Sequence, residues 1–315
     1  MNEFDLIERY FAPLSMDGLK DDGAVLAVPE GFELAVSSDV LNEGVHFPFG
    51  EAPHYIAHKA LRVNLSDLAS MGAKPLCYQL GLALSSVCDE SWLAAFSKAL
   101  SEDQALFDVK LLGGDTTSTK SGISISITAM GLVPKGEAVK RGGAKDGDVL
   151  VLSGSVGNAL IGLDILRDDV VSADEAYLLE CYRKPTPRVA LAETLRANVH
   201  AAADISDGLI ADAGHIAKAS GLACRIDLDA VEFSDAAQAQ IDVGRYSALD
   251  LMAGGDDYEL AMAIAPEKLD DFMSDAALHG IHPQVIGCFE KGSGITVVDG
   301  QGQAIAIDKA GWQHF

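Results

Sequence analysis

The sequence predicts an α/β protein, built of α+β mixed layers and divided into two domains. Its 315 residues, 49% of them hydrophobic, are more than a single hydrophobic core usually holds. Short apolar runs of strand length alternate with helical patterns in both halves of the chain. A passage rich in glycine and charge, 134–147, interrupts this pattern near the middle. We therefore expect an N-terminal domain over 1–137 and a C-terminal domain over 148–315.

Strands and at least one long helix are predicted in the first half. The strands are expected at 24–28, 33–37, 76–84, 109–112 and 123–130. In the last of these, isoleucine alternates with serine or threonine from Ile123 to Thr128, which is the pattern of a sheet with one buried face. Apolar residues recur at helical spacing over 56–71, so a helix is expected there.

The second half shows the same mixture of patterns. Helices are expected at 156–166, 173–182, 188–197 and 208–220, and strands at 148–153, 200–205, 259–265, 284–288 and 294–298. The order of the strands within a sheet does not follow from these patterns.

The net charge of the chain argues against partners that are themselves negatively charged. There are 47 acidic and 23 basic side chains, which gives a formal net charge of −24. Nucleic acids and anionic membranes would be repelled by such a chain. The excess is explained either by a solvated acidic surface or by acids gathered for a purpose, and only their positions distinguish the two.

The cysteines and the first residues of the chain indicate the cellular compartment in which the protein is expected. The five cysteines are odd in number and form no C-x-x-C pair, so neither a disulfide framework nor a zinc site is indicated. Met1 to Arg9 lack the basic start and apolar run of a secretory signal, and no stretch of 18 unbroken apolar residues occurs. We expect a cytoplasmic protein with reduced cysteines.

Acidic residues recur in six short segments beside glycine or serine, at the edges of expected elements. These are 21–23, 37–39, 64–67, 113–117, 204–208 and 254–257. Glycine permits close backbone approach, while carboxylate and hydroxyl oxygens are the ligands that Mg²⁺ prefers. A helix cap or a turn explains any one segment alone, whereas six together favour a shared site.

Asp67 is the most informative of these acids. It shares one stripe of the 56–71 helix with Ile56, Ala60 and Val63. A carboxylate on an apolar face costs several kcal/mol unless it is paired or bound to a metal, although a ragged surface stripe is the alternative. Two carboxylates 4 Å apart repel by about 4 kcal/mol at an effective dielectric constant of 20, so a converging group requires cations.

Other devices for binding phosphate are absent or incomplete. The sequence has no G-x-x-x-x-G-K-[ST] loop and no protein-kinase glycine-rich loop. The segment 154–158 opens a helix after a strand and could receive an anion there, but a simple strand-to-helix turn explains it as well. His46 and Trp312 are each open to a packing or a ligand-binding role.

Five motifs, taken in order, resemble the thiamine-monophosphate kinases of the aminoimidazole-ribonucleotide-synthetase superfamily. They are SSDVLNEGVHF (37–47), KALRVNLSDLASMGAKP (59–75), GGDTT (113–117), DISDGL (204–209) and GGDDYEL (254–260). The resemblance implies a two-domain aminoimidazole-ribonucleotide-synthetase-like fold, a homodimer, and several Mg²⁺ ions. It also implies direct in-line transfer of the γ-phosphoryl group from ATP to thiamine monophosphate, giving thiamine diphosphate and ADP.

The resemblance also implies roles for residues that match the motifs. The implied metal ligands are Asp22, Ser37 or Ser38, Asp39, Asp67, Asp115, Asp204 and Asp207. The implied nucleotide contacts are Gly114, Asp115, Arg141 and Ser206, and the implied thiamine-phosphate contacts are His46, Asp256 and Trp312. The residues expected to act in catalysis are Asp39, Asp67, Asp115 and Arg141.

Two positions depart from the family pattern, and two other functions remain open. Asp256 stands where the family usually has glutamate, and Lys20 stands where a glycine commonly precedes the first acid pair. The alternatives are another ATP-dependent enzyme of the same superfamily and a noncatalytic nucleotide-binding regulator. No general base is evident, and none is needed when the acceptor is a phosphate that is already anionic.

Overall fold

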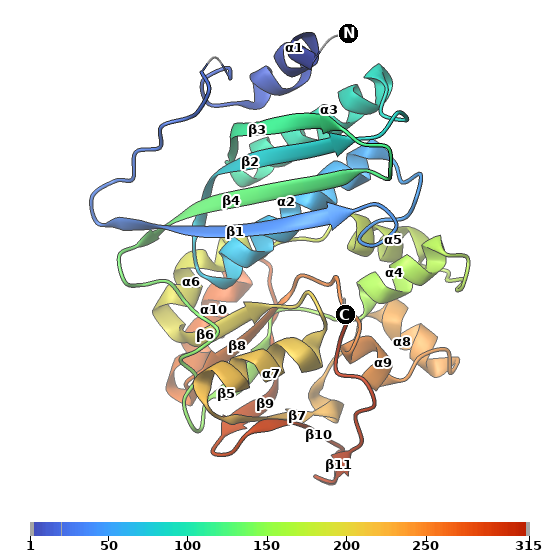
Figure 1. Ribbon diagram of the computed structural model, residues 1–315. Coiled ribbons are helices and arrows are strands. Elements are labelled where there is room, and N and C mark those ends of the chain that lie inside the picture. The colour runs from blue at the N-terminus through green and yellow to red at the C-terminus, as the bar shows by residue number, and fades with distance from the viewer. Residues whose placement is uncertain (1–2, 20, 313–315) are drawn as a thin grey trace. The chain divides into compact units, whose positions relative to one another are not determined.

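The computed structural model describes residues 3–19 and 21–312, and its contacts divide the chain into two compact units. Unit 1 comprises 1–68 and 73–137, and unit 2 comprises 69–72 and 138–315. Each unit contains its own sheet with helices packed on it, so the mixed α/β layers that the sequence predicts are present in both (Figure 1). Among the residues that the structure describes, no helix is both long and apolar enough to cross a membrane.

Unit 1 is built on a four-stranded sheet with the order β1-β4-β2-β3. The strands are β1 (Phe32–Asn42), β2 (Lys74–Leu84), β3 (Lys110–Ser118) and β4 (Ser124–Pro134). β2 and β3 run parallel, and the other neighbours are antiparallel. Along β4 the isoleucines are buried and the residues between them are partly exposed, which confirms the alternation predicted for this strand.

Two long helices, α2 (Pro53–Ser70) and α3 (Glu90–Phe107), cover the same face of this sheet (Figure 1). A buried ionic network joins them: both Arg62 and His58 of α2 hydrogen-bond the Asp103 carboxylate of α3, at 2.8 to 2.9 Å. Burial would raise the pKa of Asp103, but these donors outweigh it and hold that pKa below its usual range. The network therefore fixes α2 against α3.

The chain before β1 is irregular. It forms α1 (Glu3–Leu6), a π-helical turn (Ile7–Phe11) and a 3₁₀ turn (Ala12–Leu14), and the backbone N–H of Met16 then donates to the carbonyl of Leu111 on β3. The strand expected at 24–28 is wrong. That segment pairs with no other strand and Val25 is 99% exposed, so the apolar run there has nothing to pack against.

Unit 2 is built on a seven-stranded sheet with the order β11-β10-β7-β9-β5-β8-β6. The strands are β5 (Val149–Leu152), β6 (Val199–Asp204), β7 (Ala223–Asp227), β8 (Leu260–Ile264), β9 (Gln284–Glu290), β10 (Gly294–Val298) and β11 (Ala304–Ile305). β10 and β7 are parallel, and the remaining pairs are antiparallel.

Helices cover both faces of this second sheet. α7 (Leu209–Ser220) packs on one face, while α6 (Ala192–Asn198) and α10 (Leu269–Leu278) pack on the other (Figure 1). A third apolar cluster joins the remaining helices, which are α4 (Asn158–Leu166), α5 (Glu175–Arg183), α8 (Asp235–Asp242) and α9 (Ala248–Met252). The loops that carry the acidic motifs of unit 2 lie at the end of β6 and before β8.

Candidate functional site

The acidic group of unit 1 comprises Ser37 and Asp39 on β1 and Asn64 and Asp67 on α2. The hydroxyl of Ser37 donates to Asp67 Oδ2 at 2.5 Å, and the backbone N–H of Asp39 donates to Asn64 Oδ1 at 3.1 Å. Asn64 is fixed in turn, because its amide donates to the carbonyl of Ala60 one helical turn earlier. Edge strand and helix together therefore hold four oxygen-bearing side chains at one place.

The electrostatics of the acidic group favour a positive charge. Burial raises the pKa of Asp39 to about 6, and the negative charge of Asp67 acts in the same direction. The cost of holding both carboxylates ionised is removed either by a proton or by a cation. Because carboxylate and hydroxyl oxygens are hard ligands, Mg²⁺ fits this donor set.

Ser38 and Asp115 lie on the other face of the sheet from Asp39. Ser38 is exposed, and its hydroxyl lies 3.0 Å from that of Thr128 on β4. The register pairs Asp115 with Gly81, Gly81 with Ser126, and Ser126 with Val40, so these positions share the face of Val40 and not that of Asp39. β1 and β3 are also the two edges of the sheet, three strand spacings or roughly 14 Å apart.

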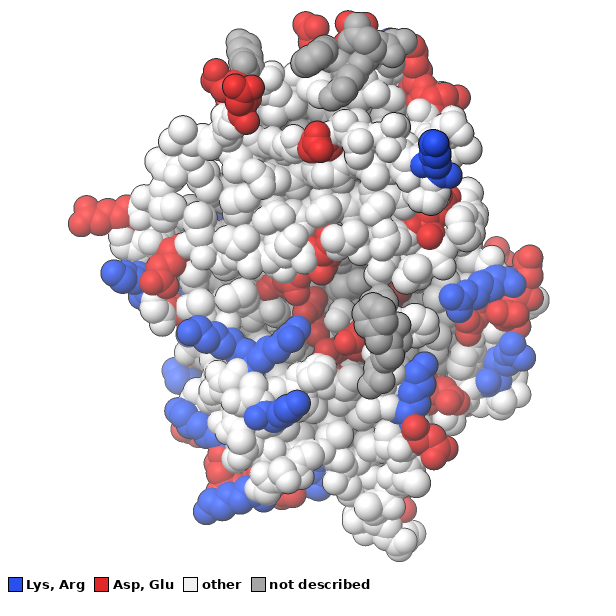
Figure 2. All heavy atoms as spheres, in the orientation of Figure 1, with Lys and Arg blue, Asp and Glu red and all other residues white. Residues whose placement is uncertain are grey.

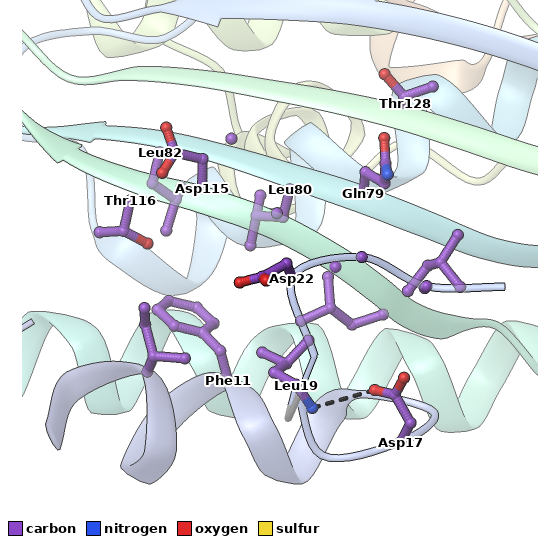
Figure 3. A pocket seen from close by; sticks show the side chains of 18 of the residues that line it. Phe11, Asp17, Leu19, Asp22, Gln79, Leu80, Leu82, Asp115, Thr116 and Thr128 are labelled. Atoms are coloured by element: carbon purple, nitrogen blue, oxygen red, sulfur yellow. Dashed lines mark hydrogen bonds between the residues drawn. The ribbon is translucent and has the colours of Figure 1, made fainter. Parts of the chain in front are cut away.

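A cavity of about 660 Å³ lies on this second face of unit 1, between the strands and the chain that precedes β1. Asp22 and Asp115 both line it, as do the backbone of Gly113 and Gly114 and the side chains of Gln79 and Thr128 (Figure 3). Aromatic and aliphatic side chains of the N-terminal segment, such as Phe11, form its opposite wall. Acidic oxygens thus meet an apolar wall in a space large enough for a small ligand.

His46 follows β1 in a tight turn. Its Nδ1 accepts a hydrogen bond of 3.0 Å from the backbone N–H of Asn42, so in the neutral ring Nε2 carries the hydrogen. The turn is closed by Glu43, whose carboxylate accepts from the N–H groups of Gly50 and Ile123. This tautomer makes Nε2 a hydrogen-bond donor, which suits an anionic ligand.

In unit 2, the 205–208 loop connects Asp204, at the end of β6, to the start of α7. Three of its peptide groups donate to one atom: the N–H groups of Ser206, Asp207 and Gly208 lie 3.1, 3.1 and 3.2 Å from Oδ2 of Asp212. Asp212 is itself 1% exposed, in the first turn of α7. The loop is therefore wrapped around a carboxylate of its own helix.

Opposing influences act on the Asp212 carboxylate. Burial raises its pKa to about 6 against the lowering effect of the backbone donors, with the charge of Asp207 raising it and that of Arg141 lowering it. Arg141 itself is exposed. Single ligand atoms of Asp207, Asp212 and His215 also lie within 4.8 Å of one another.

The segments of Asp256 and Trp312 contact the same loop through the backbone. The N–H of Asp256 donates to the carbonyl of Ser206 and that of Trp312 to the carbonyl of Asp207, both at 2.9 Å. Asp256 has a φ of +70°, a left-handed conformation that aspartate adopts more readily than glutamate does. This backbone conformation therefore suits the aspartate found here better than the glutamate that the motif resemblance leads us to expect. Its carboxylate also accepts from the Tyr258 hydroxyl at 3.1 Å.

The segment 154–158 is occupied by a carboxyl group of the chain itself. Asp257 accepts from the N–H groups of Gly157 and Ala159 at the start of α4, at 2.7 and 3.2 Å. Burial raises the pKa of Asp257 to about 8 despite these donors, and the nearby charges of Glu259 and Asp256 act in the same direction. The helix start is thus filled, and the alternative of a structural turn is the one observed.

Most of the expected site residues fall into three groups within the described residues. Unit 1 holds the acidic group and, on the other sheet face, the cavity; unit 2 holds the 205–208 loop with Asp256 and Trp312. Asn64 and Asp212 were not predicted as site residues. Their spacing could have indicated them, because Asn64 precedes Asp67 by one helical turn and Asp212 follows Gly208 by one turn. Lys20 lies outside the described residues.

Comparison with known proteins decides the family. Models of the AIR synthase related protein match the chain with their N-terminal domain at 20–133 and their C-terminal domain at 145–300. A thiamine-monophosphate kinase of Caulobacter vibrioides is 42% identical over 99% of this chain and 90% of its own length. The chain belongs to the thiamine-monophosphate kinase family.

Solved structures of thiamine-monophosphate kinases agree with the fold. The enzyme of Stenotrophomonas maltophilia superposes with a TM-score of 0.85 at 38% identity, covering 97% of this chain and 98% of that one. A structure described as AaThiL complexed with AMPPCP and TMP gives a TM-score of 0.81 at 28% identity, covering 92% and 89%. The predicted family and the two-domain aminoimidazole-ribonucleotide-synthetase-like fold are confirmed.

Proposed function

We propose that this chain catalyses the transfer of the γ-phosphoryl group of ATP to thiamine monophosphate, giving thiamine diphosphate and ADP, as its family does. In direct in-line transfer, an oxygen of the thiamine phosphate forms a bond to the γ-phosphorus while the bond from that phosphorus to the β,γ-bridging oxygen breaks. The electron pair of the broken bond leaves with ADP. The observation that carries this proposal is the full-length similarity to named thiamine-monophosphate kinases.

Mg²⁺ is the metal that the donor set supports. The acidic group of Ser37, Asp39, Asn64 and Asp67 offers only hard oxygens at short range, and its two carboxylates repel each other. When bound, the ions would neutralise the phosphate charge and orient the phosphates. We assign Asp39 and Asp67, with Ser37, to one set of ions in unit 1. We assign Asp22, Ser38 and Asp115 to ions on the other face of the same sheet, and Asp204 and Asp207 to ions in unit 2.

The chain's own groups bind and orient the two substrates. The backbone of Gly114 in the cavity, the hydroxyl of Ser206 and the guanidinium of Arg141 are suited to the nucleotide phosphates, as donors or positive charge. His46 presents an Nε2–H donor to the thiamine phosphate, while the Asp256 carboxylate and the face of Trp312 suit the cationic thiazolium ring. No base is required, since the attacking oxygen is already ionised near neutral pH.

The proposed chemistry is tested by product formation. Purified protein is incubated with ATP and thiamine monophosphate, with and without Mg²⁺, and thiamine diphosphate is measured by chromatography. Free thiamine serves as a control acceptor, to test whether the reaction requires the phosphate group of thiamine monophosphate. Mg²⁺-dependent product from the monophosphate alone is expected. ATP bound without any thiamine diphosphate formed would instead favour the noncatalytic regulator, and ADP formed only with a different acceptor would favour another enzyme of the superfamily.

We also propose a homodimer through β1, on the face of the unit 1 sheet opposite α2 and α3. The long helices α2 and α3 cover one face, and on the other β1 presents Phe32, Val36 and Val40, exposed by 42%, 54% and 51%. A second copy would cover this apolar stripe. Where a partner's β3 edge lies alongside the β1 edge, that copy's Asp115 is nearer to β1 than the Asp115 of the same chain, which is three strands away.

Subunit mixing tests whether the two acids act across the dimer. Asp39→Asn and Asp115→Asn are each expected to be inactive alone. If each site takes Asp39 from one subunit and Asp115 from the other, mixed dimers contain one intact site, and remixing restores up to about a quarter of the activity. Remixed variants that form dimers but stay inactive would place both acids in one subunit's site, and a monomer by light scattering would remove the dimer.

A cytoplasmic location is proposed from composition. The five cysteines, all within the described residues, are free thiols, as suits a reducing compartment. Acidic side chains are scattered over the face seen in Figure 2, which does not suit an anionic membrane surface. Cell fractionation with an antibody against the chain would locate it, and recovery with the membranes would contradict the proposal.

A further inference from the structure

We propose that Asp212 is a positioning residue for the phosphoryl transfer: its carboxylate holds the 205–208 loop so that nucleotide-binding and thiamine-binding residues keep one mutual arrangement. The proposal rests on the roles proposed above for Ser206, Asp256 and Trp312. It adds that these residues, although 50 and 56 positions apart in sequence, depend on a single buried carboxylate that touches neither substrate.

The first support is the number and kind of donors on Asp212 Oδ2. The N–H groups of three consecutive residues, Ser206 to Gly208, converge on this one oxygen within 3.2 Å. The N–H of Asp212 donates to the carbonyl of Gly208 at 2.9 Å, which fixes the carboxylate relative to the loop it holds. Hydrogen bonds to an ionised acceptor are roughly twice as strong as neutral ones. The ionised Asp212 therefore holds all three peptide groups in one orientation.

The second support is what the same loop does on its other side. The carbonyls of Ile205, Ser206 and Asp207 accept from the N–H groups of Tyr258, Asp256 and Trp312, each at 2.9 Å. The N–H groups of 206–208 therefore donate to Asp212, while the carbonyls of 205–207 accept from the two segments that carry the proposed thiamine-binding residues. If the amides are released, the carbonyls can rotate and both segments lose their fixed partner.

The third support is the space around the loop. A Cβ on Gly255 would collide with the carbonyl oxygen of Ser206, and one on Gly311 would lie 2.8 Å from that of Asp207. The two segments thus approach the loop backbone as closely as glycine allows. Such close contacts transmit a shift of the loop directly to the residues that follow each glycine.

The contacts of Asp212 argue against a metal-ligand role for its carboxylate. Its Oδ2 is already shared by three donors, and His215, the third member of the Asp207–Asp212–His215 trio, lies exposed on α7. The contacts instead indicate that Asp212 fixes the backbone orientation of Ser206 and Asp207.

Steady-state kinetics of Asp212→Asn give the first test. An asparagine retains the size of aspartate but not its charge. We expect the KM values for ATP and for thiamine monophosphate to rise together, with kcat falling, by roughly 10–100-fold in kcat/KM. Asp212→Glu, which keeps the charge, should recover part of this loss. The matched control is Asp250→Asn, which removes a helix-capping carboxylate on α9 of the same unit and should leave both KM values unchanged.

Two measurements without substrates separate this proposal from the proposed function. In a Trp92→Phe background Trp312 is the one remaining tryptophan, and Asp212→Asn should raise its quenching by acrylamide while Asp250→Asn should not. In the unaltered protein, amide hydrogens of 206–208 should exchange at least about 100-fold more slowly than unprotected ones, even without ligand. The exchange experiment remains informative if Asp212→Asn does not fold.

The outcomes are distinguishable. Unprotected amides at 206–208, or unchanged quenching of Trp312 in a folded Asp212→Asn protein, would overturn the anchoring role whatever the enzyme does. If the protein makes no thiamine diphosphate but the amides are protected and quenching rises, the anchor stands and the proposed function fails. A rise in only one KM would contradict the shared control of both substrates.

Discussion

Burial raises the pKa of both Asp39 in unit 1 and Asp212 in unit 2 to about 6. The two carboxylates differ in the groups that surround them. Asp212 receives three backbone hydrogen bonds, whereas Asp39 lies beside a second carboxylate, Asp67, whose charge also raises its pKa. A carboxylate whose donors come from the chain serves as an anchor. One that faces another carboxylate is poised for a cation from solution.

The largest expected effect is on turnover, from removing one of the facing carboxylates. Asp67→Asn should lower kcat by roughly a thousandfold, because the charge that balances cations and phosphates is lost where it acts. Glu33→Gln, which removes one charge from the same strand β1 that carries Asp39, is the control and should remain active. Thiamine diphosphate formation measures both, with circular dichroism confirming the fold. Activity of Asp67→Asn within tenfold of the unaltered enzyme would remove the metal-group mechanism.

An anchored carboxylate in unit 1 should behave in the opposite way. Asp103→Asn leaves Arg62 without its buried partner and should lower the free energy of unfolding by about 3 kcal/mol, while kcat changes little. Urea unfolding and steady-state kinetics would measure the two quantities separately. A large fall in kcat with unchanged stability would contradict the structural role of Asp103 and its distinction from the proposed metal-binding carboxylates.

The pH dependence of stability should reveal Asp257. Its folded pKa of about 8 lies above the ordinary value of 3.8, so the native state holds a proton that the unfolded chain has lost between these values. Stability should therefore fall as pH rises from about 4 to about 8, by roughly 1–4 kcal/mol from this group. Asp257→Asn should flatten this fall in urea titrations at pH values of about 4.5 and about 8. Parallel pH profiles for variant and unaltered protein would show that the carboxyl is ionised throughout.

The smallest expected effect concerns Asp256. Asp256→Glu introduces the glutamate that the motif resemblance predicts, in a left-handed backbone position that suits aspartate better. We expect a change in the KM for thiamine monophosphate of a few-fold and a loss of stability of about 0.5 kcal/mol. Kinetics at saturating ATP and thermal unfolding would detect these. A gain in both stability and kcat/KM would show that the backbone does not favour aspartate there.

Local sequence patterns predicted many of the helices and strands. The Ile123–Thr128 alternation and the apolar stripe of α2 were readable because one face of each element is buried and the other is not. The helices α8, α9 and α10 were not predicted. α8 and α9 are short, although Ser234 and Ser247 cap them. The segment 24–28 shows what local patterns lack: an apolar run becomes a strand only beside another strand, and pairing is a property of the fold.

The candidate site was indicated by its motifs more than by its geometry. Acid, glycine and serine at the ends of expected elements marked Asp39, Asp67 and the 205–208 loop in the sequence itself. That Asp39 and Asp115 occupy opposite faces of one sheet follows only from strand order and register, which the sequence does not give. The roles of Asp212 and Asp257 were missed because their partners are backbone N–H groups, which the side-chain sequence does not identify.

The claim that the acidic group of unit 1 requires a cation is tested most directly by thermal unfolding across a Mg²⁺ series, without nucleotide or thiamine phosphate. The melting temperature of the unaltered protein should rise by several degrees, because the ions bind the native state and relieve the Asp39–Asp67 repulsion. Asp67→Asn should gain much less than Glu33→Gln does. Equal gains in Asp67→Asn and in the unaltered protein would contradict the cation requirement.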